Sequence, residues 1–141
     1  MPAGIHRATW EEVEQVFGTT NHRVRLLDGL YEAMVQLKIA GCRRIYVNGS
    51  FVTAEPHPAD FDACWDPVGV DPYLLDPILL DCRPPRHAQK ARYHGELVPS
   101  SATAAVGYSY LQYFQVDKNS GDPKGIVAMD LAMFTIKQST P

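Results

Sequence analysis

The sequence predicts a single domain of the α+β class, an α/β sandwich in which a short mixed β-sheet is flanked by helices. Three observations lead to this prediction. The chain has 141 residues, and domains typically contain roughly 100–200. Its 45% hydrophobic and 21% charged residues are typical of a globular protein and exclude disordered, collagen-like and coiled-coil chains. Segments with helical periodicity alternate with short β-branched segments, and this mixture is typical of one sheet covered by helices. We therefore expect one domain over residues 1–141.

Two helices are expected in the first forty residues. Residues 9–12 (TWEE) match a capping box, in which Thr9 caps a helix and Glu12 bonds back to the cap. This helix is expected to end at Phe17. Asn21 can cap a second helix, which ends near Gly41. Its apolar residues recur at three- and four-residue steps and predict one buried face, made of Val24, Leu27, Tyr31, Met34 and Leu37.

The middle of the chain predicts two strands and a helix. Residues 43–47 (RRIYV) are β-branched and aromatic, and residues 60–65 (DFDACW) follow a proline-rich bend, so both are expected to be strands. A helix is expected over residues 71–80, because Asp71 and Pro72 have the chemistry of a helix start. Pro77 is expected to kink it or split it.

The second half of the chain predicts further strands and turns. Residues 83–95 are polar and are expected to form a loop, and residues 96–98 a short strand. The alanine-rich segment 102–114 favours a helix. The run at 119–123 (NSGDP) is a turn signal, and it predicts a hairpin between apolar segments at 114–116 and 126–134.

Composition excludes several classes of protein. Thirteen Lys and Arg against sixteen Asp and Glu give a net charge of −3, whereas a surface built mainly to bind nucleic acid is basic. The three cysteines are too far apart for a CxxC pair, which argues against a disulfide framework or a zinc site and favours a reducing compartment. No signal peptide and no apolar run of the roughly 20 residues needed to span a bilayer is found. We expect a cytoplasmic protein without a membrane segment.

The segment from Gly49 to Asp62 carries the strongest chemical signal. The pair Gly49-Ser50 follows a predicted strand and is separated by nine residues from Asp60-Phe61-Asp62. Alternation along a strand places Asp60 and Asp62 on one face. Two adjacent carboxylates repel each other unless a cation lies between them, and oxygen ligands suit Mg²⁺ or Mn²⁺. The Gly-Ser turn supplies backbone N–H groups that can hold an anion.

A third acidic residue, Asp130, interrupts the apolar segment 126–134. A charge in an apolar strand is costly unless it is paired or bound to metal. We therefore expect Asp130 to join Asp60 and Asp62, to complete a second metal position and to orient or deprotonate an attacking hydroxyl. The alternative is a Gly-Ser turn with Asp60 and Asp62 solvated at a strand end and Asp130 at an exposed edge.

These segments resemble the signature of the polymerase β-type nucleotidyltransferase superfamily: a hydrophobic strand, Gly-Ser, a short gap, Asp-hydrophobic-Asp and a later hydrophobic-Asp-hydrophobic strand. The layout is also similar to a small bacterial family of stand-alone minimal nucleotidyltransferase-like proteins. The resemblance covers about residues 22–134. It implies that Asp60, Asp62 and Asp130 bind metal and catalyse, and that Gly49 and Ser50 contact the triphosphate.

Basic residues predict where phosphates bind. Residues 45–82 contain seven acidic side chains and no Lys or Arg, and a basic segment follows. Because phosphate contacts come mainly from Lys and Arg, we expect nucleotide contacts from Lys90, Arg92 and Lys124; the alternative is that they are solvated. Four aromatic residues suit base stacking, although packing is the preferred interpretation: Tyr108, Tyr110, Tyr113 and Phe114.

The expected function is metal-dependent transfer of a nucleoside monophosphate from an NTP to a hydroxyl of a protein or RNA. The resemblance also implies a toxin–antitoxin or defence setting in bacteria. The alternative is a non-catalytic binding module that acts as an antitoxin on a protein partner. A chain of 141 residues has no room for a second, acceptor-binding half, so acceptor recognition is expected from loops, a second copy of the chain in a homo-oligomer, or a partner.

Overall fold

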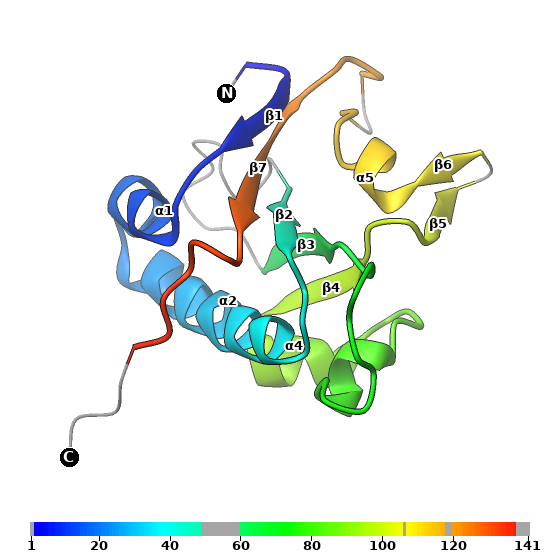
Figure 1. The fold of residues 1–141 in the computed structure, drawn as a ribbon. Helices are drawn as coiled ribbons and strands as arrows, with labels where there is room; N and C mark the ends of the chain where they lie inside the picture. The colour runs from blue at the N-terminus through cyan, green and yellow to red at the C-terminus, as the bar shows by residue number, and fades with distance from the viewer. Residues whose placement is uncertain (1, 49–59, 106, 118–119, 138–141) are drawn as a thin grey trace.

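The computed structural model describes residues 2–48, 60–105, 107–117 and 120–137. They form, in chain order, β1 (Gly4–Arg7), α1 (Trp10–Phe17), α2 (Asn21–Ile39), β2 (Arg44–Val47), β3 (Phe61–Trp65), the 3-10 helix η1 (Pro77–Leu80), α4 (His87–Tyr93), β4 (Gly95–Pro99), β5 (Thr103–Ala105), β6 (Tyr108–Ser109), α5 (Tyr110–Tyr113) and β7 (Gly125–Asp130) (Figure 1). The predicted α+β class is confirmed.

The main sheet is mixed, as predicted. Its strand order is β1-β7-β2-β3-β4. The outer pairs β1·β7 and β3·β4 are parallel, and the inner pairs β7·β2 and β2·β3 are antiparallel. Helices α1, α2 and α4 lie on one side of this sheet, and α5 with the small sheet β5-β6 lies at the other side (Figure 1). The sequence did not predict β1, whose four residues GIHR are mostly exposed.

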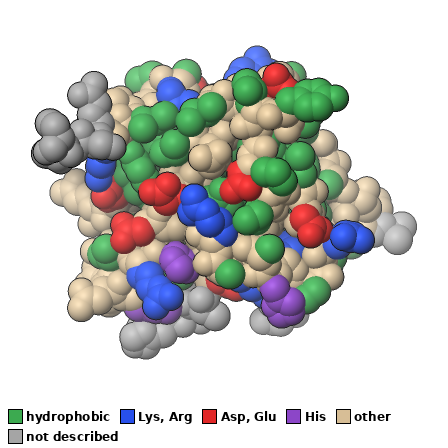
Figure 2. All heavy atoms as spheres, turned by 90° about the horizontal axis from the view of Figure 1, so that it is seen from below, with side chains coloured by type: hydrophobic (Ala, Val, Ile, Leu, Met, Phe, Trp, Pro, Cys, Tyr) green, Lys and Arg blue, Asp and Glu red, His purple; other side chains and the backbone are tan. Residues whose placement is uncertain are grey.

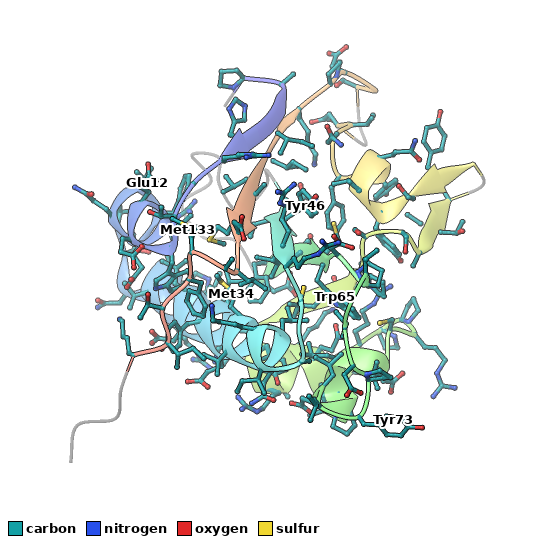
Figure 3. The ribbon with its side chains drawn as sticks, viewed as in Figure 1. Glu12, Met34, Tyr46, Trp65, Tyr73 and Met133 are labelled. Atoms are coloured by element: carbon teal, nitrogen blue, oxygen red, sulfur yellow. The ribbon has the colours of Figure 1, made fainter. Side chains whose placement is uncertain are left out.

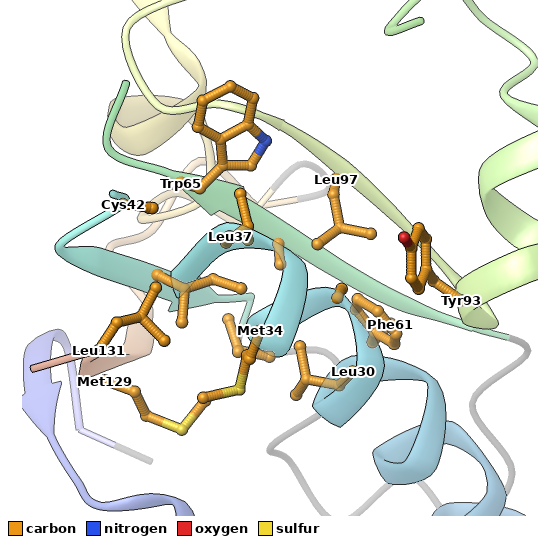
Figure 4. Packing of buried hydrophobic residues seen from close by; sticks show 14 of the residues in the cluster. Leu30, Met34, Leu37, Cys42, Phe61, Trp65, Tyr93, Leu97, Met129 and Leu131 are labelled. Atoms are coloured by element: carbon orange, nitrogen blue, oxygen red, sulfur yellow. The ribbon is translucent and has the colours of Figure 1, made fainter. Parts of the chain in front are cut away.

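Alternation along the strands divides the core between the two faces of the sheet. On the helical face, Leu30, Met34 and Leu37 of α2 pack against strand residues that include Phe61 and Leu97 (Figure 4). The opposite face has a smaller cluster, which consists of Tyr46, Cys64, Val98, Phe114, Ile126 and Ala128. This second face matters for function, because Asp62 and Glu96 alternate with the helical-face residues on β3 and β4 and therefore belong to it.

The two N-terminal helices agree with their predictions except at two positions. Thr9 caps α1 and forms the full capping box with Glu12. Helix α2 is capped by Thr20 rather than by Asn21, because the Thr20 side chain accepts the Arg23 N–H at 3.1 Å. Val24 is 44% exposed instead of buried. Leu27, Met34 and Leu37 are buried as predicted, and Leu26, Leu30 and Ala33 complete the buried stripe. Tyr31 is partly buried and packs against this core.

The helix expected over residues 71–80 is wrong. Only η1 (Pro77–Leu80) is helical, and Asp76 caps it through the Ile78 N–H. The Asp71 carboxylate accepts the Tyr73 N–H in a local turn, and such side-chain bonds compete with helix formation. Tyr73 is 95% exposed and points away from the molecule (Figure 3).

The loop expected over residues 83–95 is also wrong, because it contains α4. This helix is polar in sequence, but Gln89 is fully buried and attaches it to the sheet. The Gln89 side chain accepts the Leu97 N–H at 2.8 Å and donates to the Leu97 carbonyl at 2.9 Å. A buried amide thus satisfies the backbone of the edge strand β4, and no hydrophobic periodicity announces it.

Two further predictions are corrected in the second half of the chain. Residues 102–114 form β5, β6 and the short α5 instead of one helix. The expected hairpin is reduced to an isolated bridge between Val116 and Pro123, because β7 pairs with β1 and β2 in the main sheet. The strand expected at residues 96–98 is confirmed as β4.

Candidate functional site

Three carboxylates converge at one end of β3 and β4. Asp62 and Glu96 are register partners in the parallel pair β3·β4, so their side chains are neighbours on one face of the sheet. Asp60 immediately precedes β3. One carboxylate oxygen from each of Asp60, Asp62 and Glu96 lies within 4.8 Å of the others, and all three residues are half-buried. The structure thus brings Asp60 and Asp62 together as expected. We refer to these three residues as the acidic cluster.

Glu96 was not among the residues selected from the sequence. A usable signal was present, since Glu96 is an acidic residue between Gly95 and Leu97 in a short predicted strand. Asp130, in contrast, interrupts a longer apolar run, which is the stronger signal in the sequence. Only the pairing of β3 with β4 shows that Glu96 is the third carboxylate.

The expectation that Asp130 joins Asp60 and Asp62 is wrong. Strand β7 runs antiparallel to β2, and Asp130 is the register partner of Arg44 at the start of β2. Asp62 lies at the other end, where its carbonyl accepts the Asn48 N–H at 2.8 Å. At about 3.3 Å per residue, the four residues from Arg44 to Asn48 correspond to roughly 13 Å along the sheet. The Asp130 side chain is exposed and accepts the Ala132 N–H where β7 ends.

Two cationic side chains of the α4 region face the acidic cluster. Lys90 Nζ lies 4.0 Å from Asp60 Oδ2 and 3.9 Å from Glu96 Oε1. Arg86 Nη1 lies 3.3 Å from the same Glu96 oxygen. These contacts partly neutralise Asp60 and Glu96 and so reduce the repulsion within the acidic cluster. Arg86 is the residue immediately before α4, and Lys90 lies within the helix, so this one short helix positions both side chains.

The other predicted nucleotide contacts have different outcomes. Lys124 lines a pocket together with Asp62 and Glu96. Arg92 does not join the cluster, because its guanidinium lies 4.7 Å from the centroid of the Tyr93 ring. Lys90 and Arg92 are two positions apart on α4, and residues at that spacing point in different directions. Gly49 and Ser50 lie outside the described residues.

Burial and like charge both act on Asp60. Desolvation is the main cause that raises the pKa of Asp60 above its usual value, and the nearby Glu96 raises it further; Lys90 lowers it. A carboxyl group in this environment gains from a nearby cation, because the cation offsets both unfavourable contributions.

Two pockets adjoin the acidic cluster. The first has a volume of about 310 Å³ and is lined by Asp62 and Glu96, by cations and by aromatic rings of the α5 region. The second, of about 270 Å³, is lined by Asp60 and Lys90, by His22 and Arg25 of α2, and by His94, which follows α4. Seen from the α4 side, the molecule carries acidic side chains interspersed with Lys, Arg and His (Figure 2). The acidic cluster therefore contributes Asp62 and Glu96 to the first pocket and Asp60 to the second.

The donor set fits a hard divalent cation. Asp60, Asp62 and Glu96 offer only carboxylate oxygens, which Mg²⁺ and Mn²⁺ prefer. Octahedral Mg²⁺ has bond lengths of about 2.0–2.1 Å, so opposite ligands are roughly 4.2 Å apart. Adjacent ligands of such an ion are only about 2.9 Å apart, so oxygens spaced by up to 4.8 Å must move closer together to bind one ion. The three cysteines are free thiols, and none of them belongs to this cluster.

None of the helices in the described part of the chain is long and apolar enough to cross a bilayer. No curated protein and no solved structure matches the chain. A family model matches residues 1–130, which is most of the sequence. The chain therefore belongs to the family described as a family of unknown function (DUF6932).

Proposed function

We propose that this protein is a metal-dependent nucleotidyltransferase that moves a nucleoside monophosphate from an NTP to a hydroxyl of a protein or RNA. The observation that carries the proposal is the convergence of Asp60, Asp62 and Glu96 beside a pocket that is also lined by Lys and Arg side chains. The resemblance of the Asp60-Phe61-Asp62 segment to the polymerase β-type superfamily supports it. The third carboxylate in this proposal is Glu96 instead of Asp130.

Each part of the site has a role in such a reaction. Asp60, Asp62 and Glu96 would hold Mg²⁺ or Mn²⁺, which neutralises phosphate charge and makes the α-phosphorus more electrophilic. Lys90 and Lys124 attract the triphosphate. The acceptor oxygen forms a bond to the α-phosphorus, the bond to the β-phosphate oxygen breaks, and pyrophosphate leaves. A carboxylate of the cluster accepts the hydroxyl proton.

The test is transfer of label from α-labelled NTPs to components of a cell lysate, with Mg²⁺ or Mn²⁺ present. We expect Asp62→Asn and Glu96→Gln to reduce labelling by roughly 100-fold or more, the scale of lost acid–base and metal assistance. Asp130→Asn is the matched control, because Asp130 is an exposed strand-end carboxylate on the same sheet. Labelling that survives both cluster substitutions, or that Asp130→Asn abolishes equally, would refute the proposal.

One observation favours a second candidate function, a non-catalytic module that binds a protein partner as an antitoxin. Lys90 and Arg86 already pair with the acidic cluster inside the chain, so the carboxylates have counter-ions without a metal. The two candidates differ in a binding measurement. A binding module takes up neither Mn²⁺ nor NTP at the cluster, whereas the enzyme binds both and loses Mn²⁺ when Asp62 is replaced by Asn.

The proposal includes a cytoplasmic location and a partner or second copy of the chain that helps to recognise the acceptor. The free thiols Cys42, Cys64 and Cys82 support a reducing compartment. The first pocket, at about 310 Å³, is at the lower end of the range of small-molecule sites, roughly 300–1,000 Å³. It suits an NTP better than a macromolecular acceptor, which must then be recognised outside it.

A further inference from the structure

The first pocket has an aromatic wall whose rings differ in exposure. Phe114 is 6% exposed and packs into the smaller core cluster of the sheet. Tyr110 and Tyr113 contact it, with ring centroids 5.9 Å and 6.4 Å from the Phe114 ring. Tyr113 is 41% exposed and lines the pocket. Packing, the preferred interpretation from the sequence, therefore accounts for Phe114, while Tyr113 leaves ring surface open to a ligand.

Arg86 connects this wall to the acidic cluster. Its side chain is 11% exposed and is held by the Cys82 carbonyl, which accepts from Nε at 2.9 Å. Nη2 donates to the Tyr110 hydroxyl at 2.8 Å, and Nη1 donates to Glu96 at 3.3 Å. The guanidinium also lies 5.7 Å from the centroid of the Tyr110 ring. The aromatic wall thus has a defined position relative to the carboxylates.

The lining defines the chemistry of a matching ligand. Tyr113 offers a ring, Val116 offers an apolar surface, and Lys124 and Arg86 offer positive charge at the same pocket. A ligand that uses all of these has a flat aromatic part and an anionic part, and it is small enough for about 310 Å³. A nucleoside phosphate has this combination, and its base can stack on a tyrosine regardless of base identity.

We propose that the pocket between β4 and α5 holds the nucleoside end of the NTP, with the base stacked on Tyr113 and the phosphates directed toward the acidic cluster. This inference rests on the proposed function, because it takes the carboxylates as the phosphate end of the site. It adds the orientation of the substrate. The pyrophosphate end then faces the second pocket, where Lys90 and Arg25 lie.

The test compares a nucleotide with a ligand that lacks the base. Binding of α,β-methylene-ATP and of inorganic triphosphate is measured by calorimetry with Mg²⁺ for wild type, Tyr113→Leu and Tyr113→Phe. The matched control is Tyr108→Leu, since Tyr108 is 55% exposed but is not among the residues that line the pocket. We expect Tyr113→Leu to weaken nucleotide binding about tenfold, within the range for base stacking on an aromatic side chain. Tyr113→Phe should stay within about twofold of wild type, because it keeps the stacking ring. Tyr108→Leu should do the same, because it leaves Tyr113 unchanged.

Triphosphate affinity shows whether the effect belongs to the base. It should be the same in all variants, and this also shows that Tyr113→Leu is folded. Nucleotide binding that Tyr113→Leu leaves unchanged, or an equal loss of nucleotide and triphosphate, overturns the inference, and so does a wild-type protein that binds neither ligand. If labelling depends on Asp62 but binding does not depend on Tyr113, only this inference fails. If binding depends on Tyr113 and no transfer occurs, only the proposed catalytic function fails.

Discussion

Replacement of Lys90 by Gln should tighten the binding of Mn²⁺ to the protein in the absence of nucleotide. Lys90 Nζ lies about equally far from Asp60 and Glu96, at 4.0 and 3.9 Å. A divalent cation held by these carboxylates must displace the ammonium group or accept its repulsion. Gln keeps the length and polarity of the side chain but removes the charge, so the metal no longer competes with it.

The magnitude follows from the two ion pairs. At 4 Å and an effective dielectric constant of 20, one pair of unit charges interacts by about 4 kcal/mol. Solvent screens this interaction strongly here, since the Lys90 side chain is 40% exposed and its partners are 27% and 25% exposed. Exposed pairs contribute about 0.2–1 kcal/mol each. Two pairs then give about 0.4–2 kcal/mol, which corresponds to a roughly 2- to 30-fold lower Kd for Mn²⁺.

The assay is titration with Mn²⁺ followed by electron paramagnetic resonance of the free ion, at neutral pH and low salt. Arg92→Gln is the control, because it removes the same charge from the same helix, but its guanidinium lies over Tyr93. The difference between the two variants should shrink at high salt, since screening weakens exposed charges. A Kd for Lys90→Gln equal to that of Arg92→Gln, or higher than that of wild type, would refute this reasoning.

Three further predictions concern stability. Gly29→Ala should lower the melting temperature, because a Cβ there would lie 1.8 Å from the Tyr93 carbonyl oxygen. The overpacking cost of about 1–3 kcal/mol outweighs the gain in helix propensity of about 1 kcal/mol. An unchanged melting temperature contradicts this prediction. Tyr93→Phe should lower the free energy of unfolding in urea by about 1–3 kcal/mol, since the buried hydroxyl donates to the Asp76 carboxylate; an equally stable variant would show that this bond contributes nothing. Burial raises the pKa of Cys42 to about 11 and of Cys64 to about 12, from 9.0. As the pH rises, the unfolded chain therefore loses these protons before the folded chain does. The free energy of unfolding should fall above about pH 9, by up to about 1.4 kcal/mol per pH unit for each thiol. Urea unfolding at a series of pH values tests this, and it fails if Cys64→Ala leaves the slope of unfolding free energy against pH unchanged.

Features that depend on neighbouring residues were predictable from the sequence. The capping box that begins α1 needs only Thr9 and Glu12, three residues apart. The juxtaposition of Asp60 and Asp62 needs only the alternation of an extended chain around Phe61. The same is true of the mixed α+β class, because short apolar strands and one long amphipathic helix are visible in the periodicity.

Features that depend on distant segments required the tertiary structure. Helix α4 has a polar sequence, and it is held by the bonds of Gln89 to the backbone of β4, which no pattern within the helix reveals. Lys90 faces the acidic cluster only because this helix forms and packs there. The cluster partner of Asp62 is likewise set by long-range pairing.

Asp130 and Glu96 illustrate this division most directly. Each is an acidic residue in a short, largely apolar strand, and the sequence predicts only that such a carboxylate needs a partner or solvent. The register of β7 on β2 places Asp130 opposite Arg44, and the register of β4 on β3 places Glu96 opposite Asp62. Register is decided by which faces of the strands are buried together and not by spacing along the chain. For this reason only the folded sheet selects the residue that completes the site.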